Sequence, residues 1–353
     1  LRLLPGDSVK ALVLPKLGGW QDLTVADVPA PEIRRPNEVR VRVHTAGINH
    51  LDLFILGGLP GITYAFPHIV GSDAAGTIES VGAEVTGWAV GDRVMLNPGI
   101  GCNACDLCAA DQQPLCLRYA LLGEHVPGTV GEYVVVPATN LARIPQAMPW
   151  AEAAGFSLAA LTSWRMMTGR ARVRAGETVL IWGIGGGVAQ SCLQIAKMLG
   201  ATVIVTSSSD DKLERARALG ADHLLNHARE DVPKAVRAIT GGRNADVVVD
   251  NVGEATWQKS LRALGRGGRL VTCGGTTGPM VTTDVRKLFW YQWDILGSTM
   301  GGDREYQEVA RHAFEGRFWP VVDSVVPLSE GREAFHRMAD GAQFGKLVIE
   351  VAP

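Results

Sequence analysis

Residues 178–182 read TVLIW and run directly into residues 183–189, GIGGGVA, after which residues 188–199 have the apolar periodicity of a helix. A buried strand followed by a glycine-rich turn and a helix is typical of dinucleotide-binding sites. The small residues let backbone N–H groups approach a pyrophosphate, and the N-terminus of the helix attracts its negative charge. The stretch therefore predicts a nucleotide-binding turn. The alternative is an ordinary tight turn between a strand and a helix.

The glycine pattern of this turn departs from the strict form G-x-G-x-x-G. The third glycine position of that form falls on Val188, whereas Gly183, Gly186 and Ala189 meet the same steric need with a longer loop. We expect the cofactor to contact the turn at Gly183, Gly185, Gly186, Gly187 and Val188.

The order of elements around the turn supports the nucleotide prediction. From about residue 178, short apolar runs alternate with amphipathic stretches, and the runs are apolar throughout, as expected of strands covered on both faces. The runs occupy residues 178–182, 202–206, 223–225, 246–250, 269–273 and 294–297. Strands that alternate with helices predict an α/β protein with a doubly wound parallel sheet of the Rossmann type.

The chain on either side of this region has a different character. Residues 1–150 contain short β-branched runs separated by Gly and Pro, which indicate a β-rich or barrel-like domain. These runs occupy residues 10–14, 39–44, 76–81, 92–96 and 132–136. After about residue 300 we expect a helix at 304–314 and a last strand at 346–351 that could return to the first domain.

Composition and charge exclude several classes of function. The chain has 353 residues, and its formal net charge of −2 favours neither nucleic acid nor an anionic membrane as a partner. At roughly 150 residues per domain this length suggests two domains. A membrane span needs about 18 or more consecutive apolar residues, which the sequence lacks, and residues 1–5, LRLLP, do not resemble a signal peptide. We expect a soluble, cytoplasmic protein in which residues 1–8 precede the first strand.

The end of the second predicted strand favours NADP over NAD. A carboxylate about 20 residues after the turn would hold the ribose hydroxyls of NAD, but this strand ends in the serines 207–209. Hydroxyls and a nearby lysine suit a 2′-phosphate, so the candidate ligands are Ser207, Ser208 and Lys212. Two alternatives stay open: Ser208 with Asp211 resembles a helix capping box, and Asp210 or Asp211 could reach the ribose of NAD.

Four of the six cysteines lie in one short segment, at Cys102, Cys105, Cys108 and Cys116. Four thiolates at this spacing suit tetrahedral zinc, and metal is favoured over disulfides in an intracellular protein. Because four protein ligands leave no open position for water or substrate, we expect one structural zinc. Free thiols, a redox pair or an iron–sulfur cluster are the alternatives.

Together these motifs resemble the medium-chain dehydrogenase/reductase superfamily, in its alcohol dehydrogenase and quinone oxidoreductase group. The resemblance covers nearly the whole chain and includes the cysteine lobe, the glycine turn and four further motifs. These motifs are Gly71-Ser72-Asp73 with Gly76 and Gly82, Gly91-Asp92-Arg93-Val94, Gly131-Glu132-Tyr133, and Gly345-Lys346-Leu347-Val348.

The resemblance implies two domains with the active site in the cleft between them. A GroES-like β-rich catalytic domain is expected at residues 1–158 and 298–353, with a structural zinc lobe at residues 99–119. A Rossmann dinucleotide-binding domain is expected at residues 159–297.

The resemblance breaks at the catalytic metal. Zinc alcohol dehydrogenases of this group hold a second zinc with a cysteine, a histidine, and a cysteine or acid that comes just before the Rossmann domain. By the family's motifs, these positions fall here on Asn49, Ser72 and Leu158. None supplies the thiolate or imidazole that such sites use. A makeshift site built from His50, His68, Asp73 and His125 is the alternative.

The loss of these ligands implies a different chemistry. Without a metal to stabilise an alkoxide, the easier reaction is hydride transfer from NADPH to a conjugated carbonyl or a quinone, where the substrate delocalises charge onto oxygen. Zinc-free quinone oxidoreductases carry asparagine at the position of Asn49. The resemblance therefore implies that Asn49 donates to, or orients, the substrate carbonyl oxygen. A purely structural asparagine is the alternative.

The same resemblance implies further contacts to the nicotinamide or the phosphates. These residues are Thr162, Asn251, Val252, Gly253, Gly274, Ser298, Phe344 and Lys346.

Three functions remain open. The first is a zinc-stabilised NADPH oxidoreductase of quinones, enones or related carbonyls that uses no catalytic metal. The second is an alcohol or aldehyde dehydrogenase with an unconventional second zinc, and the third is a nucleotide-binding protein without turnover. The expected partner is a small molecule, and the resemblance favours a homodimer or homotetramer.

Overall fold

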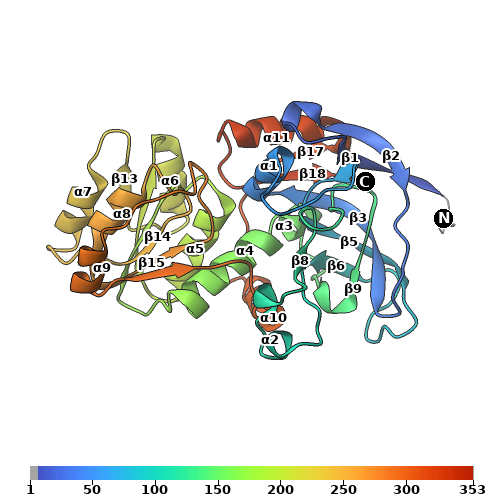
Figure 1. The fold of residues 1–353 in the computed structure, drawn as a ribbon, viewed down its shortest axis with the longest axis horizontal. Coiled ribbons are helices and arrows are strands. Elements are labelled where there is room, and N and C mark those ends of the chain that lie inside the picture. The colour runs from blue at the N-terminus through green and yellow to red at the C-terminus, as the bar shows by residue number, and fades with distance from the viewer. Residues whose placement is uncertain (1–6, 353) are drawn as a thin grey trace. The chain divides into compact units, whose positions relative to one another are not determined.

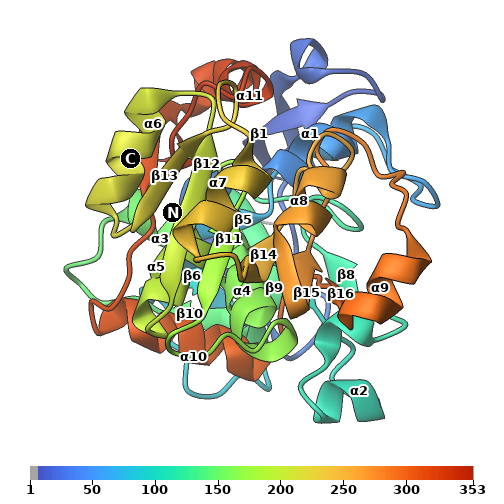
Figure 2. The same ribbon diagram turned by 90° about the vertical axis from the view of Figure 1, so that its left-hand side faces the viewer.

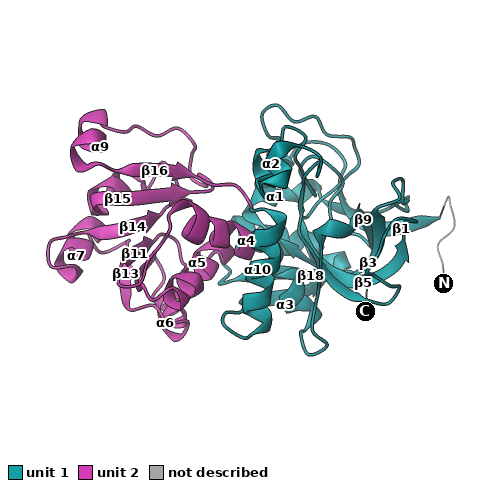
Figure 3. Cartoon of the chain, turned by 90° about the horizontal axis from the view of Figure 1, so that it is seen from below, with its two compact units in different colours: residues 1–159, 301–353 teal, residues 160–300 magenta. Residues whose placement is uncertain are grey.

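The structure is a computed structural model that describes residues 7–352. The chain forms two compact units, residues 1–159 with 301–353 and residues 160–300 (Figure 3). The second unit ends after Met300, three residues beyond the expected limit at residue 297. The expectation for residues 1–8 falls largely outside the described residues, and strand β1 (Ser8–Leu14) begins at Ser8.

Residues 160–300, all of which are described, contain the predicted parallel sheet (Figure 2). Its strands are β11 (Thr178–Ile181), β12 (Thr202–Ser207), β13 (His223–Asn226), β14 (Ala245–Val249), β15 (Leu264–Thr272) and β16 (Asp294–Gly297). They run parallel in the order β13-β12-β11-β14-β15-β16. In this arrangement the strand order reverses between β11 and β14, which is where ligands bind in open α/β sheets. The prediction of a doubly wound sheet is confirmed.

Helices connect these strands and surround the sheet (Figure 2). They are α5 (Gly187–Met198), α6 (Asp210–Ala218), α7 (Val232–Ile239), α8 (Trp257–Ala263) and α9 (Val285–Tyr291). The strand side chains of Leu180, Ile204, Val248 and Leu270 are fully buried. Burial on both faces explains why these strands are apolar throughout.

The described residues of the first unit, 7–159 and 301–352, build a β-rich fold (Figure 1). The main sheet has the order β10-β6-β5-β3-β18-β17, with β9 also paired to β3, and a smaller sheet has the order β2-β1-β4. The bounds are β2 (Thr24–Pro29), β3 (Glu38–Ile48), β4 (His68–Ile69), β5 (Asp73–Val81), β6 (Arg93–Leu96), β9 (Tyr133–Pro137), β10 (Leu141–Arg143), β17 (Val322–Pro327) and β18 (Lys346–Glu350).

The last strand returns to the first unit, as the sequence predicted. β18 pairs antiparallel with β3, with Leu347 opposite Ile48. On its other side β3 pairs with β5, with Gly47 opposite Asp73. The end of β3 therefore lies between the start of β5 and the start of β18, three segments that are far apart in the sequence.

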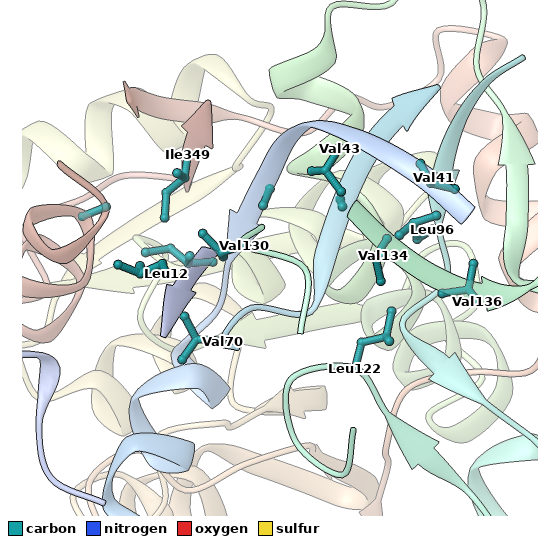
Figure 4. Packing of buried hydrophobic residues seen from close by; sticks show 14 of the residues in the cluster. Leu12, Val41, Val43, Val70, Leu96, Leu122, Val130, Val134, Val136 and Ile349 are labelled. Carbon is teal, nitrogen blue, oxygen red and sulfur yellow. The ribbon is translucent and has the colours of Figure 1, made fainter. Parts of the chain in front are cut away.

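Apolar side chains hold this sheet in place. Val41, Val43, Val134 and Leu96 are buried against one another in the core of the first unit (Figure 4). Helix α3 (Trp150–Ala154) lies against the same strands, and a side chain at Gly47 would clash with the carbonyl oxygen of Ala154. The packing makes the end of β3 a rigid support for the residues that follow it.

Several helices of the first unit have no counterpart in the sequence prediction. They are α1 (His50–Gly57), α2 (Asp106–Ala109), α3, α4 (Ser157–Trp164), which runs into the second unit, and α11 (Gly331–Ala339), whereas α10 (Asp303–Phe314) matches the predicted helix at 304–314. Among the described residues, no helix has both the length and the apolar character needed to cross a membrane.

Candidate functional site

Asn49 is the first residue after β3 and the N-cap of α1, and its side chain belongs to a buried polar network. Its Oδ1 accepts a hydrogen bond from Nζ of Lys346, and its Nδ2 donates to Oδ2 of Asp73 at 3.0 Å. Lys346 Nζ also donates to Oδ2 of Asp73 at 3.1 Å. The exposed fractions of Asn49, Lys346 and Asp73 are 7%, 4% and 0%. An amide, an ammonium and a carboxylate thus form a closed triangle in the interior of the first unit.

None of the three positions at which the family resemblance implies zinc ligands carries a thiolate, imidazole or carboxylate side chain. Ser72 Oγ donates to the carbonyl of Leu122 at 2.8 Å, and the backbone N–H of Leu158 donates to Asp73 Oδ1 at 2.7 Å. The amide oxygen of Asn49 is bonded to the Lys346 ammonium. A zinc ion needs thiolate, imidazole or carboxylate ligands. The neutral groups of Asn49 and Ser72 and the apolar side chain of Leu158, with the Lys346 ammonium beside them, do not fit it.

The makeshift second site is not formed by the described residues. His68 Nε2 bonds the carbonyl of Gly123 at 2.7 Å, and His125 Nδ1 accepts from the N–H of Leu121 at 3.3 Å. Within residues 7–352, the four cysteines are the only group of three or more His, Cys, Asp or Glu side chains whose ligand atoms converge.

Asp52 lies in the first turn of α1, beside the network. It is fully buried; its Oδ2 accepts the N–H of Asn49 at 2.7 Å, and its Oδ1 has no partner among the described residues. Burial raises the pKa of Asp52 to about 7; the Asn49 N–H and Lys346 oppose the shift, and Asp73 and Glu124 add to it. Asp52 is therefore a carboxyl group that titrates near neutral pH.

We expect Asp52→Asn to change how stability depends on pH. The folded protein holds the Asp52 proton more tightly than the unfolded chain, whose pKa is near 3.8. The contribution of Asp52 to the free energy of unfolding is therefore greatest below pH 3.8 and falls as the pH rises to about 7. Relative to the wild type, Asp52→Asn should gain stability over that range, by up to a few kcal/mol.

Urea unfolding at pH 5 and pH 8 measures this difference. Asn at position 52 keeps an oxygen that can accept the N–H of Asn49, so the helix cap is retained. Asp27→Asn, at an exposed position, is the control. An equal stability difference between wild type and Asp52→Asn at both pH values would contradict the prediction.

The predicted metal lobe is assembled. The four Sγ atoms of Cys102, Cys105, Cys108 and Cys116 lie within 4.8 Å of one another. A hydrogen bond from the N–H of Ala104 lowers the pKa of Cys102 to about 6, whereas burial raises the pKa of Cys108 to about 12. Zinc would bind all four as thiolates and leave no open coordination position. The lobe therefore has the composition and geometry of a structural zinc site.

The glycine turn of the second unit has the features that a dinucleotide needs. Gly183 has a φ of +67°, in the left-handed region, and its N–H donates to Thr206 Oγ1 at 3.2 Å. α5 begins at Gly187, no side chain caps its N-terminus, and a Cβ added at Gly186 would meet no other atom within 4 Å. The first N–H groups of α5 are thus available to an anion, which fits the pyrophosphate of a nicotinamide dinucleotide.

The serines at the end of β12 have different surroundings. Ser207 is buried, and its Oγ accepts the N–H of Ser209 at 3.1 Å, while Ser208 is exposed. Ser209, and not Ser208, is the N-cap of α6, and its Oγ accepts the N–H of Lys212 at 3.4 Å. The capping-box alternative for Ser208 is therefore wrong by one residue, because α6 starts at Asp210.

The remaining predicted cofactor residues of the second unit follow the carboxyl ends of its strands or lie in α4. Asn251 Oδ1 accepts the N–H of Cys273 at 3.0 Å, and the Ser298 N–H donates to the Thr272 carbonyl at 2.9 Å. Gly253 follows β14 with a φ of +86°, and Gly274 follows β15. Thr162, in α4, is 4% exposed. Ligands bind at this edge of open α/β sheets.

Sequence reasoning missed the acid that organises the turn after β14. Asp250 is fully buried; its Oδ1 accepts the N–H groups of Val252 and Gly253 and the hydroxyl of Thr256, and its Oδ2 accepts the Ser260 hydroxyl. An aspartate at the end of an otherwise apolar run was the available signal.

Sequence reasoning also missed the buried partners of Asn49. Lys346 was expected among the cofactor contacts, but its Nζ bonds Asn49 and Asp73 within the first unit. No spacing along the chain could reveal this, because 297 positions separate Lys346 from Asn49.

Known proteins resemble this chain over nearly its whole length. Residues 35–146 match the alcohol dehydrogenase GroES-like domain, and residues 187–315 match the zinc-binding dehydrogenase family. An alcohol dehydrogenase of Geobacillus stearothermophilus is 33% identical, with 93% of this chain and 96% of that protein covered. A crotonyl-CoA carboxylase/reductase of Cereibacter sphaeroides is 30% identical, with 90% and 81% covered.

Among solved structures, an NAD-dependent alcohol dehydrogenase is 42% identical, with a TM-score of 0.93, and the match covers 97% of this chain and 100% of that one. Three findings point to the same family: the two matching family models, the Rossmann-type sheet and the four-cysteine lobe. The chain therefore belongs to the zinc-type alcohol dehydrogenase family of the medium-chain dehydrogenase/reductase superfamily, and it is an NAD(P)-dependent oxidoreductase with the structural four-cysteine zinc site of that family.

Proposed function

We propose that this oxidoreductase transfers hydride between NADP(H) and a conjugated carbonyl, a quinone or a related small substrate, without a catalytic metal. The observation that carries the proposal is the buried Asn49 amide, which Lys346 and Asp73 hold at a position that the family's zinc enzymes use for a metal ligand. The residues at the other two ligand positions support it, because Ser72 Oγ donates to the Leu122 carbonyl and the side chain of Leu158 has no ligand atom.

The reduced nicotinamide, when bound, supplies a hydride. The substrate then accumulates negative charge on its carbonyl oxygen, and the chain must stabilise that charge. One N–H of Asn49 Nδ2 is bonded to Asp73. An amide nitrogen has two N–H donors, so the second is available to the substrate oxygen. A proton from solvent completes the reduction. Stabilisation of a developing oxyanion by a fixed donor is often a large part of catalysis.

The names of the relatives support two candidate functions. The crotonyl group in the name of the Cereibacter sphaeroides relative has a C=C bond conjugated to its carbonyl, as the proposal requires. The second candidate is alcohol or aldehyde oxidation with an unconventional second zinc. It is favoured by the relatives named alcohol dehydrogenase, including the 42% identical structure.

Metal analysis combined with a substrate panel separates the two candidates. We expect one zinc per chain, reduction of enones or quinones by NADPH, and activity that persists when any loosely bound metal is removed. Two zincs per chain, with alcohol oxidation that is lost on selective chelation, would establish the second candidate. Tight NADPH binding without turnover of a quinone, enone, aldehyde and alcohol panel would contradict both.

The proposed preference for NADP is supported by the side chains after β12. Ser208 is exposed at the end of the strand. The first acid beyond it, Asp210, accepts from Asn226 Nδ2 at 2.7 Å and from Arg229 at 2.6 Å. The Asn226 hydrogen bond and the Arg229 contact lower the pKa of the Asp210 carboxyl. The Asp210 carboxylate is thus paired with Arg229. A 2′-phosphate at Ser208 would therefore meet hydroxyls instead of a free carboxylate.

We expect Ser208→Asp to reverse the cofactor preference. A carboxylate at this position repels the 2′-phosphate and can accept from the ribose hydroxyls of NAD. The ratio of kcat/KM for NADPH to that for NADH should fall by about 10-fold to 100-fold, given the usual cost of placing like charges together. Ser208→Ala is the matched control: it removes the hydroxyl without adding a charge, so it should lower the ratio less than Ser208→Asp does. A wild-type KM for NADPH no lower than that for NADH would contradict the preference itself.

A further inference from the structure

We propose that Lys346 is a positioning residue that fixes and polarises the Asn49 amide, so that the ammonium acts on the substrate oxygen through that amide. The inference rests on the proposed function. It gives Lys346 a role different from the cofactor contact that the family resemblance implies. The observation behind it is the hydrogen bond from Lys346 Nζ to Asn49 Oδ1 inside the first unit.

The chemistry of the triangle allows only one orientation of the Asn49 amide. The ammonium of Lys346 can only donate, so the group facing it must be Oδ1 of Asn49. The Asp73 carboxylate can only accept, so the group facing it must be Nδ2. The observed contacts obey both conditions. A flipped amide would place N–H groups against the ammonium and an oxygen against the carboxylate, so the second N–H is held in one direction.

The same hydrogen bond makes the Asn49 amide a stronger donor. A positive charge at the amide oxygen draws electron density from the nitrogen, and hydrogen bonds in a chain strengthen one another in a low-dielectric interior. Lys346 is 4% exposed and Asn49 is 7% exposed, so water screens this effect only weakly. The positive charge is thereby transmitted to an N–H that can face the substrate, without direct contact between Lys346 and the substrate.

The fold places Lys346 rigidly for this role. It is the first residue of β18, and its neighbour Leu347 is opposite Ile48, the residue before Asn49. The aliphatic stem of Lys346 passes beside Gly155, which has no side chain to obstruct it. Asp73, held by the Leu158 N–H at 2.7 Å, balances the charge. Each corner of the triangle is thus fixed by backbone structure.

A double-mutant cycle on Asn49 and Lys346 tests the inference. Lys346→Met removes the ammonium and keeps the length of the side chain, but it leaves Asp73 buried without its cation, which can unfold the protein. Lys346→Met/Asp73→Asn removes both charges and is the variant in which folding is preserved. The matched control is Arg40→Met/Glu79→Gln, which removes a mostly buried ion pair, at 2.7 Å, between the neighbouring strands β3 and β5.

The kinetic outcome separates the possible roles of Lys346. In the folded double variant we expect kcat to fall on the order of 10-fold to 100-fold, somewhat less than for loss of a direct oxyanion donor, with an unchanged dissociation constant for NADPH. Adding Asn49→Ala to that variant should cost little more, because both changes act through one amide. Lys346→Arg should recover part of kcat. The control pair should leave kcat unchanged.

Two kinetic results would overturn the inference. If the costs of the Asn49 and Lys346 changes multiply, the residues act independently. If NADPH binding weakens while kcat is kept, Lys346 is a cofactor contact.

A spectroscopic measurement keeps this test separate from the proposed function. In protein labelled with ¹⁵N-asparagine, the side-chain N–H signals of Asn49, assigned by their loss in Asn49→Ala, should shift and exchange faster in Lys346→Met/Asp73→Asn than in Asp73→Asn alone, because Asp73 itself accepts one of these N–H groups. Unchanged signals would overturn the inference whatever substrate the enzyme uses. Conversely, a wild type that reduces no enone or quinone but shows the expected signal change would overturn only the proposed function.

Discussion

Asn49→Ala is expected to lower kcat for enone or quinone reduction by about 10²-fold to 10³-fold, the usual cost of removing one oxyanion donor. The change removes the amide whose Nδ2 donates to Asp73 and whose second N–H is proposed to donate to the substrate oxygen. KM should change much less, because this donor acts mainly on charge that develops during the reaction. Steady-state kinetics with NADPH and an enone measure the split.

Two variants control for structural effects of this change. Asn49→Asp keeps the size of the side chain but replaces the amide donor with an acceptor, so it should be at least as slow as Asn49→Ala. Asn140→Ala removes another buried asparagine, which donates to the carbonyls of Asn97 and Gly99. It should reduce stability without a comparable loss of kcat. If Asn49→Ala kept nearly full kcat, Asn49 would be the purely structural residue of the alternative.

Loss of the structural zinc is the second large effect that we expect. Structural zinc contributes about 10–16 kcal/mol of apparent binding free energy in zinc-finger peptides, and that energy supports the local fold. Cys108→Ser removes a buried ligand of the lobe. We expect zinc content to fall from one per chain to near zero, and the segment 99–119 to become sensitive to protease.

Elemental analysis and limited proteolysis followed by mass spectrometry measure these two quantities. Cys192→Ala is the matched control, because Cys192 is a buried cysteine outside the lobe. It should keep the zinc and the protease resistance of the lobe. If wild-type protein that is freshly purified without chelator contains no zinc, the prediction of a structural zinc site is contradicted.

The parts of the fold that depend on local pattern could be predicted from the sequence. The run 178–189 predicted strand β11, the turn and helix α5, because a glycine turn between an apolar strand and an amphipathic helix is determined by neighbouring residues. The four cysteines are close in sequence, so their convergence could also be predicted. Short helices such as α3 and α11 were missed because tertiary packing stabilises them more than their own periodicity does.

The arrangement around Asn49 could be predicted only in part. The sequence showed that three expected zinc ligands are replaced, and it singled out Asn49. It could not show that β18 pairs with β3 in the register that brings Lys346 to Asn49, since pairing between distant strands depends on the whole sheet. The raised pKa of Asp52 likewise follows from complete burial, which no local pattern reports.

The pairing of β18 with β3 has a consequence for synthesis on the ribosome. Asn49 is made 297 residues before Lys346, an interval of about 15–60 s at translation rates of roughly 5–20 residues per second. During that time residues 160–300 can fold as a contiguous unit, whereas β3 has no β18 beside it. The nascent chain therefore carries an open strand edge, which favours wrong pairing, until β18 emerges from the ribosome. Its arrival completes both the sheet and the buried charge pair in one step.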